Sequence, residues 1–215
     1  LHGNAENIST HFAHVAWLAR AGIDAFVFDY RGYGRSSGSP TLEGLHLDAS
    51  AALDALIARP ETTPERIAVF GQSLGGAVAL GMVAARPDKD RLAALIVEGA
   101  FSDYRAIARE KLGQFWLTWP LQWPLGFTID GRYSPTAAAA ELSPLPFLVI
   151  HGQKDKVVPP HHGDRLFEAG SEPKVIWRPA DAVHIQALAT IEARKRVFAY
   201  LTSAFVDHHD RDPAS

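Results

Sequence analysis

Short apolar runs alternate with amphipathic stretches over most of the 215 residues. The runs are rich in Val, Ile and Phe and lack apolar–polar alternation, as expected for strands that are covered on both faces. Five runs have this character: residues 25–30, 66–71, 92–98, 147–151 and 174–178. Because helical patterns separate them, the chain is predicted to form an α/β fold with a mostly parallel sheet and helices on both faces.

Three stretches repeat apolar residues at helical spacing. One of them follows Thr41, a residue type that favours the N-cap of a helix. The three apolar faces consist of Ile8, Phe12, Val15 and Ala19; of Leu42, Leu45, Ala49, Leu53 and Leu56; and of Leu188, Ile191, Phe198, Leu201 and Phe205. Residues 101–145 fit the alternation poorly. We therefore expect a single domain over residues 1–215, with a small cap insertion at about 101–145.

Charge and composition exclude several classes of function. The net charge is −3 and the basic residues are scattered, so we expect no nucleic-acid partner. The absence of cysteine excludes disulfides and thiolate metal sites. No apolar run reaches the roughly 18 residues that a membrane span needs.

The start of the sequence suggests that more chain precedes it. The first residue is Leu1, and the only methionine is Met82. We therefore expect a piece of a longer protein, in which an earlier segment could carry a signal or a membrane contact. The sequence leaves the compartment open.

Residues 71–75, Gly-Gln-Ser-Leu-Gly, match the G-x-S-x-G motif of a nucleophilic serine. In this motif the serine lies on a sharp turn from strand to helix, and small flanking residues let the chain pass close to itself. The apolar run 66–71 leads into the motif, and a stretch of small and apolar residues, 75–80, follows it. This context predicts that Ser73 is a nucleophile at the end of a strand.

A serine hydroxyl needs a base to remove its proton, and the base needs a third group to orient it. In the chain order of this motif, the acid follows the serine and the histidine comes last. Asp155 lies just past the run 147–151, so we expect it at the same sheet edge as Ser73. Asp103, which follows the preceding run, is a rival acid. His184 follows the last run by one short loop and is the predicted base.

The other histidines fit this role less well. Several precede Ser73, which is the wrong chain order, and His208 and His209 belong to the polar tail. His161 and His162 start a helix and have no accompanying ligands at metal-like spacing. We therefore predict no metal site and no cofactor.

An oxyanion that forms on an attacked carbonyl needs two backbone donors. We expect one to be the N–H of Leu74, directly after the nucleophile. Asn4, in the loop that opens the chain, is the second candidate. Asn4 and Asn7 could instead cap a helix that begins near Ile8.

Residues 29–36, Asp-Tyr-Arg-Gly-Tyr-Gly-Arg-Ser, invite comparison with nucleotide-binding loops because of their glycines. They lack the third glycine of a dinucleotide motif and the Gly-Lys pair of a phosphate loop. We expect a tight loop beside the active site instead.

These motifs together resemble the Bem46-like α/β-hydrolases. The resemblance rests on residues 1–8, 29–36, 71–76 and 151–159 and covers nearly the whole chain. That group is similar to the mammalian α/β-hydrolase-domain proteins 12, 13 and 17 and to serine aminopeptidase-like hydrolases. Its members are often membrane-associated through an N-terminal helix, and they cleave acyl esters, thioesters or lysophospholipids.

The resemblance implies an α/β-hydrolase fold and assigns roles to particular residues. It implies Ser73, Asp155 and His184 as a catalytic triad, with Asn4 and Leu74 as oxyanion donors. The approach to the histidine, Asp-Ala-Val at 181–183, departs from the glycine-rich pattern of the family. The strands that the resemblance implies before His2 are not part of this sequence.

From these residues we expect a serine hydrolase that transfers an acyl group from a small-molecule ester or thioester to water. The insertion contains Trp116, Trp119 and Trp123, which we expect to contact an acyl chain; packing of the cap onto the body would explain them equally well.

Three other functions remain open for the same residues. One is a serine aminopeptidase-like enzyme in which Glu98 or Asp103 holds the α-amine. A second is a cofactor-free haloperoxidase. The third is a catalytically silent binding protein on this fold.

Overall fold

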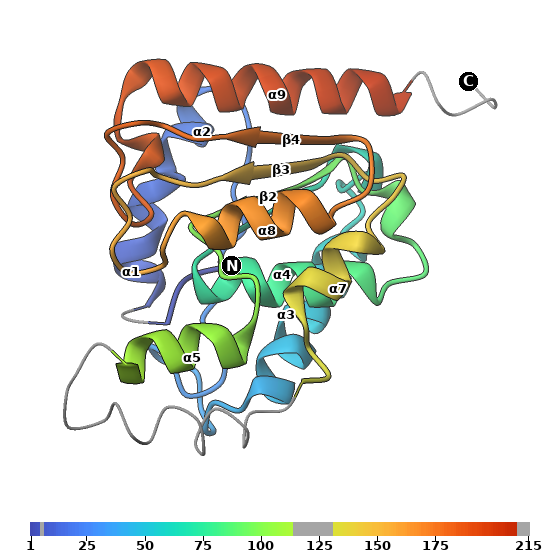
Figure 1. Ribbon diagram of the computed structural model, residues 1–215. Coiled ribbons are helices and arrows are strands. Elements are labelled where there is room, and N and C mark those ends of the chain that lie inside the picture. Colours follow the sequence, from blue (N-terminus) through green and yellow to red (C-terminus); the bar gives the residue numbers. More distant parts are fainter. Residues whose placement is uncertain (5–6, 114–130, 210–215) are drawn as a thin grey trace.

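The computed structural model describes residues 1–4, 7–113 and 131–209 (Figure 1). Its sheet has four strands, all parallel, in the order β1-β2-β3-β4. The register pairs Gln72 with Glu98, Glu98 with Ile150 and Ile150 with Trp177, so the four strands end at one edge. The strands are β1 (Ala68–Gln72), β2 (Ala94–Glu98), β3 (Phe147–Ile150) and β4 (Lys174–Trp177).

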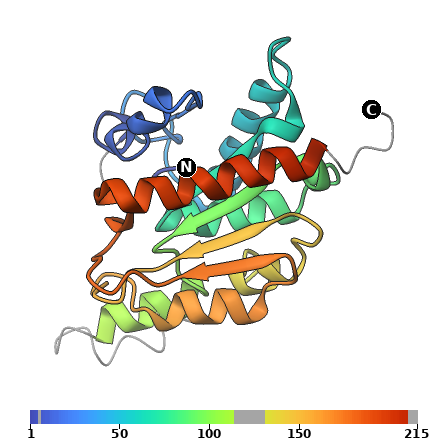
Figure 2. The same ribbon diagram turned by 90° about the horizontal axis from the view of Figure 1, so that it is seen from above.

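Helices cover both faces of this sheet (Figures 1 and 2). One face packs against α9 (Ile191–His209), the 3-10 turn η5 (Ala187–Ala189) and α2 (Ala16–Arg20). The other face packs against α3 (Leu42–Ile57), α4 (Leu74–Ala84), α7 (Pro135–Ala140) and α8 (His161–Ala169). The predicted arrangement of a parallel sheet with helices on both faces is confirmed.

Strand β2 shows why its sequence is apolar at successive positions. Leu95 and Val97 are buried in the core beside α3 and α4, whereas Ile96 is buried in the core beside α9. Successive side chains of a strand point to opposite faces, so a strand that is covered twice buries them all. Full burial of one such side chain stabilises the fold by about 1.5–3 kcal/mol.

Four of the five predicted strands are confirmed with slightly shifted ends, but the strand predicted at residues 25–30 is wrong. The free edge of β1 is occupied by Leu1, whose carbonyl accepts a hydrogen bond of 3.1 Å from the N–H of Gln72. A strand needs a hydrogen-bonded neighbour. Within the described part of the chain, the apolar residues 25–30 have no strand to pair with.

The helix predicted after Thr41 is confirmed as α3. The hydroxyl of Thr41 accepts a hydrogen bond of 3.0 Å from the N–H of Gly44, which caps the helix as expected. Leu45, Ala49 and Leu53 are buried on its inner face. The predicted closing helix is confirmed as α9.

The first predicted helix is broken into three short pieces. They are α1 (Ile8–His11), the 3-10 turn η1 (Phe12–His14) and α2. None of their residues is fully buried. Because most helical stability in proteins comes from packing one apolar face, a weakly packed segment has little to keep it continuous.

The insertion expected at about 101–145 is described only at its two ends. Helix α5 (Tyr104–Gly113) follows β2 and contains no fully buried residue. In contrast, α7 and the turn after it contribute Ala138, Ala139, Leu142 and Leu145 to the main core. The described end at 135–145 is thus part of the helical layer on the sheet.

Two further 3-10 turns precede strands, η2 (Pro64–Arg66) before β1 and η3 (Lys89–Arg91) before β2. Among the described helices, none combines the length and the apolar character required to cross a membrane.

Candidate active site

Ser73 lies on a strained turn between the end of β1 and the start of α4. Its backbone has φ 54° and ψ −119°, outside the regions that residues with side chains favour. Its N–H donates a hydrogen bond of 2.9 Å to the carbonyl of Glu98 on the neighbouring strand. This backbone shape lifts the serine side chain above the carboxyl edge of the sheet, as the motif predicts.

The small residues around Ser73 are a steric requirement. A Cβ on Gly71 would lie 2.7 Å from the Cα of Gly76, and a Cβ on Gly76 would lie 2.7 Å from the Cβ of Ala100. Both distances are shorter than real Cβ contacts. The turn therefore closes only because these positions lack side chains.

The structure brings Ser73, His184 and Asp155 together. Nε2 of His184 lies 3.0 Å from Oγ of Ser73, and Nδ1 of the same ring lies 2.8 Å from Oδ2 of Asp155. His184 comes from the loop between β4 and η5, and Asp155 from the loop after β3. Ile185, which follows the histidine, has a positive φ of 48°. For a β-branched residue this marks a strained turn of the kind that clusters at functional sites.

Asp155 is almost fully buried, and its hydrogen bonds favour its ionised form. Burial raises the pKa of its carboxyl group, but the hydrogen bonds from His184 and from the backbone N–H groups of Val158 and Val157 outweigh burial and lower it. An ionised carboxylate accepts the Nδ1 proton of His184. This leaves Nε2 free to accept the proton of the Ser73 hydroxyl.

His151 braces the loop that carries Asp155. It is buried, and its Nε2 lies 2.9 Å from the carbonyl of Val158 and 3.5 Å from Oδ2 of Asp155. Burial lowers the pKa of its ring. A neutral imidazole that donates to the Val158 carbonyl holds this loop in place.

The segments that carry the two expected oxyanion donors both lie next to Ser73. Leu74 is the first residue of α4, and the N–H of a first helical residue has no intrahelical acceptor. A Cβ on Gly3 would lie 3.5 Å from the Cβ of Ser73, so the loop that carries Asn4 passes close to the serine. The hydroxyl of Tyr33 donates a hydrogen bond of 2.8 Å to Oδ1 of Asn4.

The tight loop expected at residues 29–36 supplies that tyrosine. Its backbone has positive φ at Gly32 and Gly34, and Oδ1 of Asp29 accepts a hydrogen bond of 2.8 Å from the N–H of Ile8. The loop therefore connects the start of α1 with the loop of Asn4. A residue that the sequence analysis did not single out, Tyr33, thus lies next to an expected oxyanion donor.

Two acidic residues that the sequence left open have other partners. Oδ1 of Asp103 accepts a hydrogen bond of 2.7 Å from the N–H of Ala106 and thereby caps α5. Glu98 is buried, and both of its carboxylate oxygens accept hydrogen bonds, one from Gln72 and one from Ala187. The partner of His184 is Asp155 rather than Asp103.

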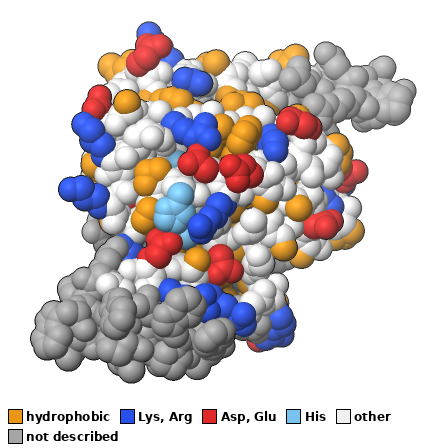
Figure 3. Space-filling model, in the orientation of Figure 1, with side chains coloured by type: hydrophobic (Ala, Val, Ile, Leu, Met, Phe, Trp, Pro, Cys, Tyr) orange, Lys and Arg blue, Asp and Glu red, His pale blue; other side chains and the backbone are white. Residues whose placement is uncertain are grey.

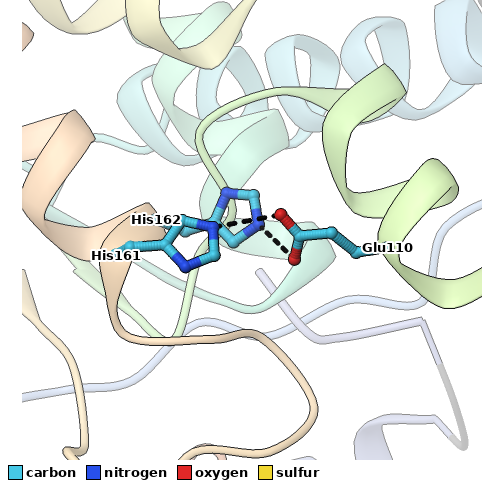
Figure 4. Close-up of side chains that lie close together, drawn as sticks. All are labelled: Glu110, His161 and His162. Carbon is cyan, nitrogen blue, oxygen red and sulfur yellow. Dashed lines mark hydrogen bonds and ion pairs between the residues drawn. The ribbon is translucent and has the colours of Figure 1, made fainter. Parts of the chain in front are cut away.

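One group of side chains among the described residues has the composition of a metal site, but its hydrogen bonds do not fit one. Nε2 of His161 and Nε2 of His162 lie 3.0 and 3.2 Å from the two oxygens of Glu110 (Figure 4). On the face of the molecule drawn in Figure 3, a histidine side chain is exposed among charged side chains of both signs. Nδ1 of His162 accepts a hydrogen bond of 3.1 Å from the backbone N–H of Ser102.

That hydrogen bond decides which nitrogen of His162 carries the proton. Burial lowers the pKa of this ring, against the opposing effect of Glu110, so the neutral form is favoured. Its Nδ1 is an acceptor, so its Nε2 carries hydrogen and donates to Glu110 instead of binding a metal. The group is a hydrogen-bonded link between α5 and α8. Glu110 lies 51 residues before His161, so the spacing of residues in the sequence gives no sign that it meets the two histidines.

The predicted substrate-contacting residues Trp116, Trp119 and Trp123 lie outside the described residues.

Comparison with known proteins shows the family to which this chain belongs. Residues 1–134 match the family described as "Serine aminopeptidase, S33". The chain is 36% identical to the uncharacterized protein YfhR of Escherichia coli (strain K12) over 188 residues, which are 87% of this chain and 62% of that protein. It is 34% identical to the protein bem46 of Schizosaccharomyces pombe over 173 residues, which are 77% of this chain and 53% of that protein. The chain thus spans less than two thirds of the length of these relatives.

Solved structures with the same fold include enzymes. The esterase Pf2001 of Pyrococcus furiosus superposes with a TM-score of 0.73 at 21% identity, over 95% of this chain and 80% of that chain. The α/β hydrolase GrgF of a Penicillium species gives 0.73 at 17% identity, over 96% and 88%. These likenesses show a shared α/β-hydrolase fold. With the family match over more than half of its length, the chain belongs to the serine aminopeptidase-like family of α/β-hydrolases, which includes relatives such as bem46.

Proposed function

We propose that this protein is a serine hydrolase that cleaves carboxylic esters or thioesters through an acyl-enzyme on Ser73. One observation carries the proposal: the ring of His184 contacts Oγ of Ser73 with one nitrogen and Oδ2 of Asp155 with the other. This is the arrangement that nucleophilic catalysis by a serine requires.

In the proposed reaction, Oγ of Ser73 attacks the acyl carbon while its proton moves to Nε2 of His184. The backbone N–H groups of Leu74 and Asn4 stabilise the oxyanion. The bond to the leaving oxygen or sulfur then breaks, and Nε2 gives that atom its proton. A water next loses a proton to Nε2 and attacks the acyl-enzyme. The bond to Oγ breaks, and Ser73 regains the proton.

The substrate class rests on the sequence of the insertion and on the hydrogen-bond partners of two acidic residues. We propose that Trp116, Trp119 and Trp123 contact an apolar acyl chain. An enzyme that removes N-terminal residues needs an acidic group to hold the α-amine. Glu98 is buried with both oxygens engaged, and Asp103 caps α5, which favours an ester over a peptide.

Active-site labelling tests the proposal directly. A fluorophosphonate probe should label the wild-type protein and leave Ser73→Ala unlabelled. On p-nitrophenyl esters of graded chain length, the same substitution should lower kcat by roughly 10⁴–10⁶-fold. A wild-type protein that takes up no probe and turns over no ester would contradict the proposal.

The description of the matched family favours a second candidate, a serine aminopeptidase. Aminoacyl-coumarin amides separate the two functions, because an aminopeptidase releases coumarin from them and an esterase with no amine-binding acid does not. Faster turnover of these amides than of acyl esters would favour the peptidase.

A further inference from the structure

Glu98, the last residue of β2, contacts three segments of the candidate site. It is 1% exposed. Its Oε2 accepts a hydrogen bond of 2.7 Å from the side-chain amide of Gln72, and its Oε1 accepts one of 2.8 Å from the N–H of Ala187. Its backbone carbonyl accepts the N–H of Ser73 at 2.9 Å. One residue thus joins the end of β1, the serine turn and the loop that carries the histidine.

The bond to Ala187 supports a turn that is otherwise strained. Ala187 lies three residues after His184, and the positive φ of Ile185 lies between them. Strained backbone persists only where its surroundings over-determine it. The carboxylate of Glu98 supplies such a constraint on the chain that leaves the histidine.

Burying a carboxylate costs free energy, whereas burying an apolar side chain of similar size does not. Burial raises the pKa of Glu98, which means that the surroundings disfavour its charge, and hydrogen bonds from Gln72 and Ala187 oppose this effect. The other four residues of β2 are apolar and buried. Another apolar side chain at this position would fill the same space. The N–H groups of Gln72 and Ala187 would then lack their acceptor.

We propose that Glu98 is a positioning residue: it fixes the loop of His184 relative to Ser73 without touching the substrate. The inference rests on the proposed function and deepens it. Displacement of the base by about 1 Å can lower the rate about 10²-fold while substrate binding is kept. Loss of the acceptor should therefore act on kcat and not on KM.

Two substitutions separate hydrogen bonding from charge. Glu98→Gln keeps an oxygen for the N–H of Ala187, and its amide can donate to Gln72 once that amide has rotated. Glu98→Leu keeps the approximate size and removes both acceptors. We expect Glu98→Gln to retain kcat within about fivefold and Glu98→Leu to lower it about 10²-fold, with KM within threefold in both. Glu65→Leu, in η2 at the opposite end of the sheet, is the matched control and should keep wild-type kinetics.

Glu98→Asp keeps the test decisive if the leucine variant does not fold. The shorter side chain retains the charge but cannot reach both partners, so kcat should fall at least tenfold with KM unchanged. Wild-type kcat in a folded Glu98→Leu or in Glu98→Asp would overturn the proposal. So would a Glu98→Gln variant as slow as Glu98→Leu, because that result would assign the effect to charge.

A measurement that needs no activity keeps this inference separate from the proposed function. The Nδ1 proton of His184, held by Asp155, should give a low-field proton NMR signal that Asp155→Asn removes. We expect the signal to persist in Glu98→Gln and to broaden or shift in Glu98→Leu. An unchanged signal in Glu98→Leu would overturn the positioning role. Absence of probe labelling in the wild-type protein would count against the proposed function alone.

Discussion

Nε2 of His184 lies 3.0 Å from Oγ of Ser73, although 111 residues separate the two in the chain. The parallel sheet makes this contact possible, because its strands all end at one edge and the segments that follow them meet there. Ser73 follows β1, and the loop of His184 follows β4 at the far side of the sheet. Asp155, after β3, lies between them in strand order.

Replacing Asp155 should impair catalysis far more than replacing the rival acid Asp103. Asp155→Asn keeps the shape but loses the charge that holds the Nδ1 proton of His184, so we expect kcat to fall by ~10⁴-fold. Asp103→Asn removes only part of the cap of α5 and should stay within threefold of wild type. Steady-state kinetics on one ester would measure both. Equal losses in the two variants would contradict the assignment of the acid.

The serine turn should not tolerate a methyl group at Gly71. A Cβ there meets backbone atoms of Gly75 and Gly76, which cannot move without opening the turn. We expect Gly71→Ala to lower the free energy of unfolding by about 3 kcal/mol and to abolish probe labelling. Gly131→Ala is the control, since the nearest atom to its Cβ would be at the flexible end of the Arg105 side chain, 3.4 Å away. Urea unfolding of both variants tests this, and full labelling of Gly71→Ala would refute the steric argument.

The stability of the fold should fall in mild acid because of His46. This residue of α3 is buried and stacks on Tyr133 at 4.2 Å between ring centroids, and its Nε2 has no hydrogen-bond partner among the described residues. Burial lowers the pKa of His46 to about 4. Between its ordinary pKa of 6.5 and this value, the unfolded chain binds a proton that the folded chain does not.

The stabilisation due to neutral His46 is therefore complete above about pH 6.5 and is lost as the pH falls towards 4. His46→Phe keeps an aromatic ring against Tyr133 and removes the titration. Between pH 7.5 and 4.5 we expect the variant to lose about 2 kcal/mol less unfolding free energy than wild type. Denaturant unfolding of wild type and His46→Phe at the two pH values measures this. Parallel losses in wild type and His46→Phe would rule out the effect.

Zinc should not stabilise the group of Glu110, His161 and His162. Since Nε2 of His162 carries hydrogen, metal binding would require the ring to give up its bond from the N–H of Ser102. We expect excess Zn²⁺ to leave the Tm unchanged, while Glu110→Ala lowers it by a few degrees because the link from α5 to α8 is lost. Differential scanning calorimetry of wild type and Glu110→Ala, with and without Zn²⁺, would measure these Tm values. A rise in Tm with zinc that disappears in Glu110→Ala would show a metal site.

Several parts of this protein were predictable because their causes are local. Thr41 caps α3 through its own side chain, and the spacing of small residues around Ser73 reflects one turn. Four of the five apolar runs form strands: β1, β2 and β3 are largely buried, whereas the edge strand β4 is only partly buried. The fifth, at residues 25–30, has the same composition but no partner strand within the described chain.

The amino-acid sequence alone determined which residues could carry the chemistry: a serine on a tight turn, and an acid and a histidine that each follow a strand. Only the tertiary structure decided that His184 meets Asp155 rather than Asp103, that Glu98 joins the serine turn to the histidine loop, and that Glu110 links α5 to α8. The physical reason is the distance along the chain over which each kind of interaction acts. Backbone conformation and apolar patterning act between near neighbours in the chain, whereas these hydrogen bonds depend on which distant segments the sheet brings to the same edge.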